Sequence, residues 1–347
     1  MSRIKLTILF YIISFVWQPL FSQFNFNPEF QDSSINNLVH PIGYKLCNLG
    51  ELGEVKKFGS KKESIILIPG WGFDAGVYEN FINEYRDRYS IYAITPAGFG
   101  GTLAPPMPDT SSKFSELTWT NGIVTGILKL IEEEQLENPV VVGHFLTGSS
   151  VALYLTANYP DKIGKVVIIS GIPYRYYQPW NDTVWGHEQK LTLDQLNRFA
   201  KYSANNWYKT VTKKTWDNGN YRPEEYSKDS LLGKILFNHS AKVPLQIMIR
   251  YLLESITFDI SPDIEQIKIP VLVLIPSFSE DFFQSTYTSL NQTIKREWIK
   301  YHFREVWNSI KNRNSFLKFE TIPDSRYFIW YDNPEATFSA IDAFLLE

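Results

Sequence analysis

The sequence has a single cysteine in 347 residues, Cys47, which excludes an internal disulfide. The alternating segment around it predicts a packed strand residue rather than a reactive thiol. No run of about 20 apolar residues is present, the length that a membrane-spanning helix needs. No group of His, Asp and Glu has the spacing of metal ligands, and neither repeats nor low-complexity tracts occur. We therefore predict a chain stabilised by one large apolar core, with no metal and no cofactor.

The first 22 residues differ from the rest of the chain. Arg3 and Lys5 precede an uncharged apolar run at residues 6–17, and Pro19 and the small residue Ser22 follow it. This is the layout of a secretory signal peptide, and the run is too short to anchor the chain in a bilayer. We predict cleavage before Gln23 and export to the periplasm or the medium, without a stable membrane anchor.

The charge balance is mildly acidic. Removal of residues 1–22, which carry two basic and no acidic residues, changes the formal net charge from −3 to −5. This acidic balance disfavours nucleic acid and anionic membranes as partners. The charge selects no small molecule, and the oligomeric state is not predicted.

Short, continuously apolar runs alternate with segments of helical periodicity from residue 64 to the C-terminus. Such runs predict strands that are buried on both faces. They lie at residues 64–68, 89–94, 140–142, 165–170, 269–275 and 316–322. Helical periodicity follows most of them, notably over residues 115–136 and from Pro334. This alternation predicts the α/β class, with a mostly parallel sheet covered by helices on both faces.

Residues 172–262 interrupt the alternation. They show helical patterns, no buried-strand pattern and four tryptophans. We predict a helical cap inserted between two strands, so that residues 23–171 and 263–347 together form the core.

Five motifs occur in a recognisable order. Residues 140–148 (VVVGHFLTG) predict a strand, a tight turn and the start of a helix. The others are PGWG at 69–72, PAGFGGT at 96–102, IKIPVLVL at 267–274 and IPDSRYF at 322–328. In this order the set resembles the α/β-hydrolase superfamily, in particular its capped members similar to epoxide hydrolases, lipases and esterases. The resemblance extends from about residue 64 to the end, with a gap at the cap.

The resemblance implies a Ser-acid-His triad, but the three corresponding positions hold other residues. Phe145 stands at the nucleophile position of the G-x-S-x-G turn, Ser279 at the acid position and Tyr327 at the histidine position. A phenyl ring cannot attack a carbonyl, a serine hydroxyl is not ionised, and a tyrosine is a poor base at neutral pH. Because the triad works as a unit, we predict that serine-hydrolase activity is absent or strongly impaired.

Other residues near these positions are fallback candidates for a rearranged site. His144, Thr147 and Ser149 surround the turn, and Glu280 and Asp281 directly follow the acid position. We expect ordinary structural roles for the first three, namely core packing and helix capping.

The resemblance also implies an oxyanion hole made by the backbone N–H groups of Trp71 and Leu146. Either these donors hold a polar ligand group, or Phe145 fills the space. We interpret the chain as an exported family member that binds a small apolar or amphipathic molecule between core and cap. Two alternatives stay open: an active hydrolase of esters, lactones or epoxides with a rearranged site, and a protein-interaction module that uses the cap surface.

Overall fold

A computed structural model describes residues 44–46, 52–174, 191–280, 282–283, 299, 303 and 306–347. The predictions for residues 1–22, Cys47 and Asp281 therefore lie outside the described residues. Export and cleavage before Gln23 stay predictions, which N-terminal sequencing of the mature protein would check. Within the described residues, no helix is both long and apolar enough to cross a bilayer.

The core of the fold is an eight-stranded sheet in the order β1-β2-β4-β3-β5-β6-β7-β8. β1 and β2 pair antiparallel, β2 pairs antiparallel with β4, and the other neighbours are parallel. The strands are β1 (Tyr44–Leu46), β2 (Glu54–Phe58), β3 (Ser64–Ile68), β4 (Ser90–Thr95), β5 (Val140–His144), β6 (Lys165–Ile169), β7 (Val271–Pro276) and β8 (Leu317–Ile322). The predicted α/β class with a mostly parallel sheet is confirmed.

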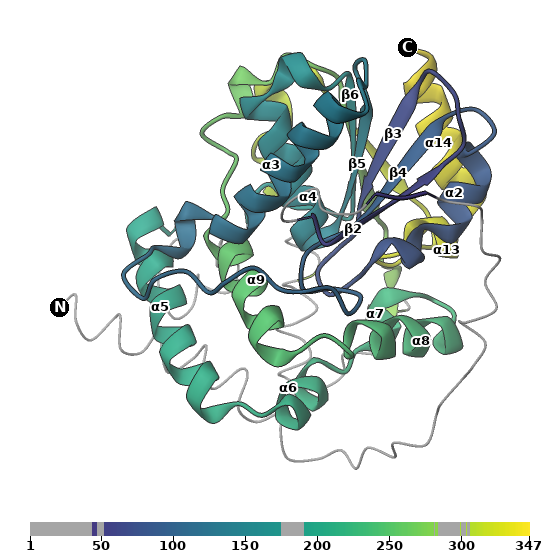
Figure 1. Cartoon of the computed structure of the whole chain (residues 1–347). Helices are drawn as coiled ribbons and strands as arrows, with labels where there is room; N and C mark the ends of the chain where they lie inside the picture. The colour runs from purple at the N-terminus through teal and green to yellow at the C-terminus, as the bar shows by residue number, and fades with distance from the viewer. Residues whose placement is uncertain are drawn as a thin grey trace.

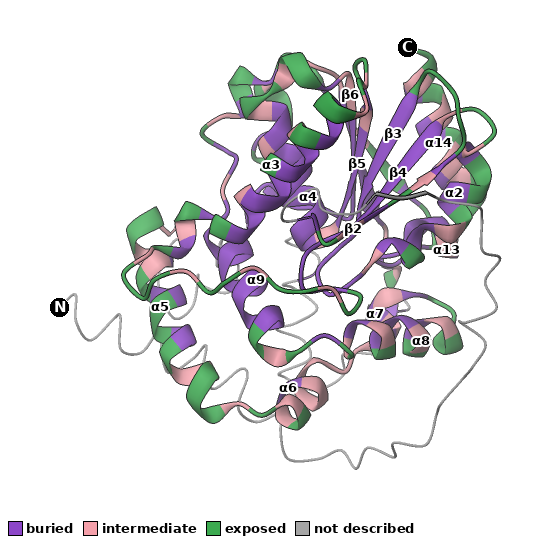
Figure 2. Ribbon diagram, in the orientation of Figure 1, coloured by how far each residue is buried: buried purple, intermediate pink, exposed green. Residues whose placement is uncertain are grey.

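Helices cover both faces of this sheet (Figure 1). α2 (Glu79–Tyr85) and α14 (Pro334–Leu346) pack together through Phe81 and Phe338. α3 (Thr118–Glu133) and α4 (Phe145–Asn158) cover the other face. Shorter helices are η4 (Ala75–Tyr78), η5 (Phe114–Glu116), η6 (Pro160–Lys162), η7 (Ile264–Gln266), α12 (Val306–Asn308), η9 (Lys311–Arg313) and α13 (Ile329–Asp332). Figure 2 shows the central strands buried on both faces, which explains their continuously apolar sequences.

The segment between β6 and β7 is helical where it is described. It contains α5 (Leu193–Thr210), α6 (Lys213–Asn220), α7 (Pro223–Tyr226), α8 (Ser230–Ser240) and α9 (Leu245–Thr257). These helices lie beyond one end of the sheet (Figure 1). One isolated bridge, between Tyr174 and Asp259, joins the two ends of the segment. The boundaries of a cap at residues 172 and 262 stay a prediction.

α3 begins three residues later than its periodicity predicts. Residues 114–116 form the turn η5, and Leu117 has a φ of +52°, so regular helix starts at Thr118. No side chain of the preceding residue caps this helix. The buried carboxylate of Glu254 on α9 does so instead, because it accepts the N–H groups of Trp119 and Thr120 at 3.0 and 2.9 Å.

Candidate functional site

The candidate site is the sharp turn between β5 and α4. Phe145 has a φ of +49°, a left-handed conformation that is strained for a bulky residue. A Cβ atom on Gly143 would lie 2.3 Å from the carbonyl oxygen of Gly148, and one on Gly148 would lie 2.2 Å from that of Ile68. Only glycine permits this approach of helix to strand. The turn therefore has the geometry that lifts a nucleophile above a sheet, but it presents a phenyl ring.

The ring of Phe145 packs against the ring of Tyr327, with centroids 4.7 Å apart. Tyr327 is only 4% exposed, and the rings of Phe278 and Phe303 also contact it. The residues expected at the nucleophile and histidine positions thus meet in this structure, as the corresponding members of a working triad must. Here they meet as an aromatic cluster, in which the ring of Phe145 has no nucleophilic atom and the hydroxyl of Tyr327 is its one polar side-chain atom.

The hydroxyl of Tyr327 contacts the cap. It donates a hydrogen bond to Oε2 of Glu225 on α7 at 3.1 Å, and both residues are buried. Sequence reasoning missed Glu225 because the two residues are 102 positions apart and no motif surrounds it. A buried carboxylate therefore lies beside the residue expected at the histidine position.

Ser279, the residue expected at the acid position, lies in the loop after β7 and has a capping role. Its hydroxyl accepts the N–H of Phe282 at 3.4 Å, and its carbonyl accepts the N–H of Phe283 at 3.2 Å. Glu280 is exposed. Phe278, in the same loop, contacts Tyr327: the centroids of the two rings are 5.3 Å apart.

His144 is a buried structural histidine. Its Nε2 lies 3.0 Å from the carbonyl oxygen of Tyr327, so Nε2 carries the proton and donates it. Among the described residues, Nδ1 has no hydrogen-bond partner. Burial lowers the pKa of the imidazole from 6.5 to about 3, which outweighs the opposing effect of the carbonyl. A neutral imidazole bound in this way positions the loop after β8 and is not oriented as a general base.

This pKa predicts an acid-dependent loss of stability. Between pH 6.5 and about 3 the unfolded chain binds a proton at residue 144 that the folded chain does not bind. The free energy of unfolding should therefore fall on acidification, by about 1.4 kcal/mol per pH unit from this residue. Urea denaturation between pH 4 and 7 measures how the free energy of unfolding depends on pH. This dependence should be weaker by the same amount in His144→Asn than in the natural protein. Identical slopes in the two proteins would contradict the assignment.

The hydroxyl candidates near the turn are buried in the helix. Ser149 donates to the carbonyl oxygen of Phe145 and approaches that of Leu146 at 3.4 Å. The hydroxyl of Thr147 is buried and has no hydrogen-bond partner among the described residues. The described structure joins neither hydroxyl to a histidine.

The two expected oxyanion donors lie on segments that meet at Phe145. Leu146 is the second residue of α4, and the N–H groups of a first helical turn have no acceptor within the helix. The turn that contains Trp71 lies close by, because a Cβ atom on Gly70 would be 2.9 Å from that of Phe145. The cap holds Trp71: its indole donates to the carbonyl of Met248 on α9 at 3.0 Å, and its ring contacts Trp216 of α6.

A further core–cap contact was also not foreseen from the sequence. Nε2 of His239 on α8 lies 3.0 Å from Oδ2 of Asp74, in the loop after β3. Burial opposes ionisation of Asp74, but the interactions with His239, the N–H of Gly76 and the charge of Lys56 together outweigh burial and lower the pKa of Asp74. The His239 ring also stacks on Phe73, with the two planes 7° apart. This pair ties α8 to the core. Within the described residues, no group of three or more His, Cys, Asp or Glu side chains is arranged to hold a metal ion.

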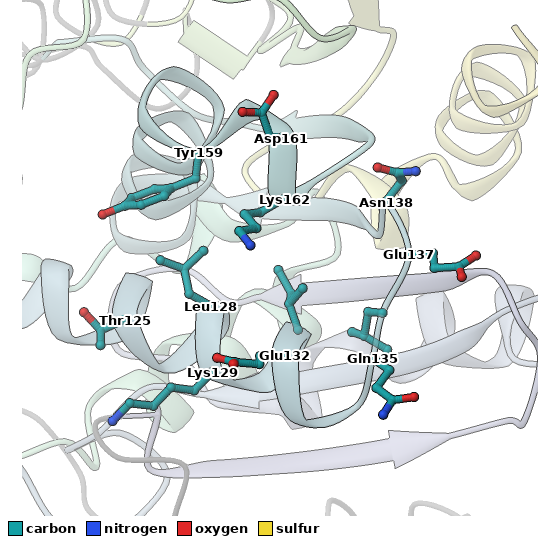
Figure 3. A pocket seen from close by; sticks show the side chains of 12 residues that line it. Thr125, Leu128, Lys129, Glu132, Gln135, Glu137, Asn138, Tyr159, Asp161 and Lys162 are labelled. Atoms are coloured by element: carbon teal, nitrogen blue, oxygen red, sulfur yellow. The ribbon is translucent and has the colours of Figure 1, made fainter.

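Two open grooves lie far from this turn, at the amino ends of the parallel strands. One has a volume of about 670 Å³ and lies between α3 and η6, with Lys129, Glu132 and Lys162 in its lining (Figure 3). Its neighbour, of about 740 Å³, includes Val140 and Lys165, the first residues of β5 and β6. Both linings mix charged and apolar groups. A chamber between sheet and cap stays a prediction.

Comparisons with known proteins agree with this architecture. The model of the "Alpha/beta hydrolase family" matches residues 65–340. Two karrikin insensitive 2 receptors of Petunia hybrida, CA and IA, are 27% and 25% identical over 157 and 159 residues. These alignments cover 45% and 46% of this chain, and the chain spans about half the length (55%) of each of these curated relatives.

Solved structures show the same fold at lower identity. An esterase from Exiguobacterium antarcticum has a TM-score of 0.60 at 13% identity, over 85% of this chain and 95% of its own. The enol-lactonase from Burkholderia xenovorans LB400 has a TM-score of 0.56 at 13% identity, over 86% and 99%. At such identities the likeness establishes the arrangement of strands and helices alone.

Proposed function

We propose that this chain, which belongs to the alpha/beta hydrolase family, is a binding protein and does not hydrolyse substrates through a Ser-acid-His triad. Its ligand is a small apolar or amphipathic molecule held between the sheet and the cap. The exported location predicted from residues 1–22 is part of this proposal.

One observation supports the loss of hydrolysis above all others. The strained turn is present, and the side chain it presents is the phenyl ring of Phe145. Covalent catalysis at this turn needs an oxygen or sulfur nucleophile with a base beside it. Phe145 has no such atom, and its neighbour Tyr327 donates its hydroxyl hydrogen to Glu225. A rearranged site gains no support from His144, whose Nε2 binds a backbone carbonyl.

The residues above the turn favour an apolar ligand. Trp71, Trp216 and Trp207 form a chain of edge-on ring contacts, with centroids 6.2 and 5.8 Å apart, which runs from the core turn into the cap. Small-molecule sites are mostly lined by such groups, with a few polar atoms that orient the ligand. The names of the petunia relatives describe receptors, which agrees with a binding role.

The test is the hydrolysis of p-nitrophenyl esters by the purified protein. We expect a rate no more than about 10³-fold above that in water, the level left by an oxyanion hole alone. Phe145→Ala should leave this rate unchanged, because the ring takes no part in chemistry. The triple variant Phe145→Ser, Tyr327→His and Ser279→Asp rebuilds a Ser-acid-His triad for comparison. A higher rate in this variant would agree with loss of hydrolytic activity in the natural chain. Turnover at an ordinary enzymatic rate that Phe145→Ala abolishes would refute the proposal.

Binding is measured on the same preparation with 1-anilinonaphthalene-8-sulfonate, an amphipathic fluorescent probe. The natural protein should bind it saturably, and Trp216→Ala should weaken binding about tenfold, as expected for loss of one buried aromatic contact. Tyr202→Ala is the control, since Tyr202 is exposed on α5. Equal affinities in all three proteins would argue against a ligand beneath the cap.

A further inference from the structure

The loop after β8 is paired with cap helix α7 through its backbone. The N–H of Tyr327 donates to the carbonyl of Glu225, and that of Phe328 donates to the carbonyl of Tyr226, both at 3.1 Å. These two hydrogen bonds join consecutive residues of the loop to consecutive residues of α7. They therefore fix both the position and the direction of α7 relative to the loop. This loop carries the histidine position of the family.

Side chains strengthen the same junction. Tyr327 donates its hydroxyl to the Glu225 carboxylate at 3.1 Å, and the two residues are 4% and 5% exposed. In so buried a place, water cannot easily replace the partner that either group would lose. The phenol oxygen stands further from the backbone than either nitrogen of an imidazole. Tyrosine therefore reaches a carboxylate on α7 that a histidine at residue 327 is too short to reach in the same way.

Asp332 forms a second part of the junction. Its carboxylate accepts the hydroxyl of Ser227 at 2.6 Å, the N–H of Lys228 at 3.0 Å and the N–H of Arg326 at 2.7 Å. The first two donors belong to the cap and the third to the loop after β8. One buried carboxylate on α13 thus holds both segments together.

The far end of α8 is attached to a different part of the core. His239 near its C-terminus pairs with Asp74 in the loop after β3. The segment that contains α7 and α8 is therefore attached to the core at both ends, at two different loops. α9 has a separate attachment, through Glu254 to the start of α3.

We propose that Tyr327 and Glu225 form a lock that holds the α7–α8 segment of the cap closed on the core. The residue at the histidine position thereby has a conformational role in place of a catalytic one. Opening of this segment requires the hydroxyl–carboxylate bond to break, while α9 stays in place. The lock operates in the ligand-free protein, so it does not depend on the proposed ligand.

Hydrogen exchange of the full, ligand-free chain tests the lock. Tyr327→Phe removes one oxygen atom and should speed exchange of the amides of residues 223–240 about tenfold, the effect expected for loss of one buried hydrogen bond. The amides of α9, residues 245–257, should exchange at their former rate. Tyr331→Phe is the matched control, because that hydroxyl binds the core carbonyl of Val77 at 3.0 Å. It should leave residues 223–240 unchanged.

A double-mutant comparison identifies the partner. Glu225→Leu should speed exchange in residues 223–240 as Tyr327→Phe does, and the two changes together should add nothing further. Unchanged exchange in both single variants would overturn the proposal, as would an equal increase in α9. Should either single variant fail to fold, the other one decides by the same criterion. The measurement involves no substrate or ligand, so its failure is distinct from failure of the proposed function.

Discussion

Replacement of Glu254 by alanine is expected to lower the free energy of unfolding by about 3–5 kcal/mol, the cost of leaving a buried charge without its partner. The Glu254 side chain is fully buried and accepts five hydrogen bonds. Two come from the guanidinium of Arg250, one turn earlier on α9. The other three come from the backbone of Trp119 and from the backbone and hydroxyl of Thr120.

Two losses add together in this variant. The guanidinium of Arg250 stays buried, 4.6 Å from the centre of the Phe114 ring, without its carboxylate. The first turn of α3 loses both its acceptor and the negative charge that favours a helix N-terminus. Urea denaturation, followed by far-ultraviolet circular dichroism, measures the change.

Glu84→Ala is the matched control. Glu84 also forms an ion pair with an arginine four residues away on a helix, Arg88, but both side chains are more than 40% exposed. Arg88 keeps Asp342 as a second partner. We expect a loss of no more than about 0.5 kcal/mol. A Glu254→Ala protein as stable as the control would show that the buried network contributes little.

Gly148→Ala is the second change with a large expected effect, a loss of about 3 kcal/mol. The added Cβ would lie 2.2 Å from the carbonyl oxygen of Ile68 and 2.7 Å from that of Pro69. Both are backbone atoms of β3 and its turn, so the clash is relieved only by moving α4 away from the sheet. The variant should also disturb Phe145, which begins α4.

Gly101→Ala provides the comparison. Gly101 has a φ of +79° but no atom within 4 Å of the added Cβ, so its cost of about 1 kcal/mol comes from backbone strain alone. Chemical denaturation of the two variants separates crowding from strain. Equal losses would contradict the close approach of helix to strand at the turn.

The motifs predicted the place of the turn because it lies within a short, locally determined segment. A buried strand followed by glycines at 143 and 148 specifies a strand–turn–helix unit wherever it occurs. The order of such units along the chain then limits the sheet to few topologies. The resemblance assigns Phe145 and Tyr327 to two positions of one triad, and the contact between their rings comes from the structure.

The partners of these residues could not be expected. Glu225 lies in a cap segment that contains no motif. Nothing in the sequence distinguishes it from a glutamate on the exposed surface of a helix. Glu254 and Asp74 are similar cases: each acts on a segment more than 130 residues away. Periodicity reports which face of a helix is buried, but it does not report which distant polar group that face meets.

The sequence by itself determined the α/β fold, the position of the turn and the phenyl side chain there, because apolar periodicity and side-chain chemistry are local properties. The tertiary structure decided which contacts the residues at the expected triad positions make. It placed Phe145 against Tyr327, bound Tyr327 to Glu225 and buried His144 so that its pKa is about 3. These outcomes depend on burial and on contacts between distant segments, which arise only when the sheet and the cap pack together.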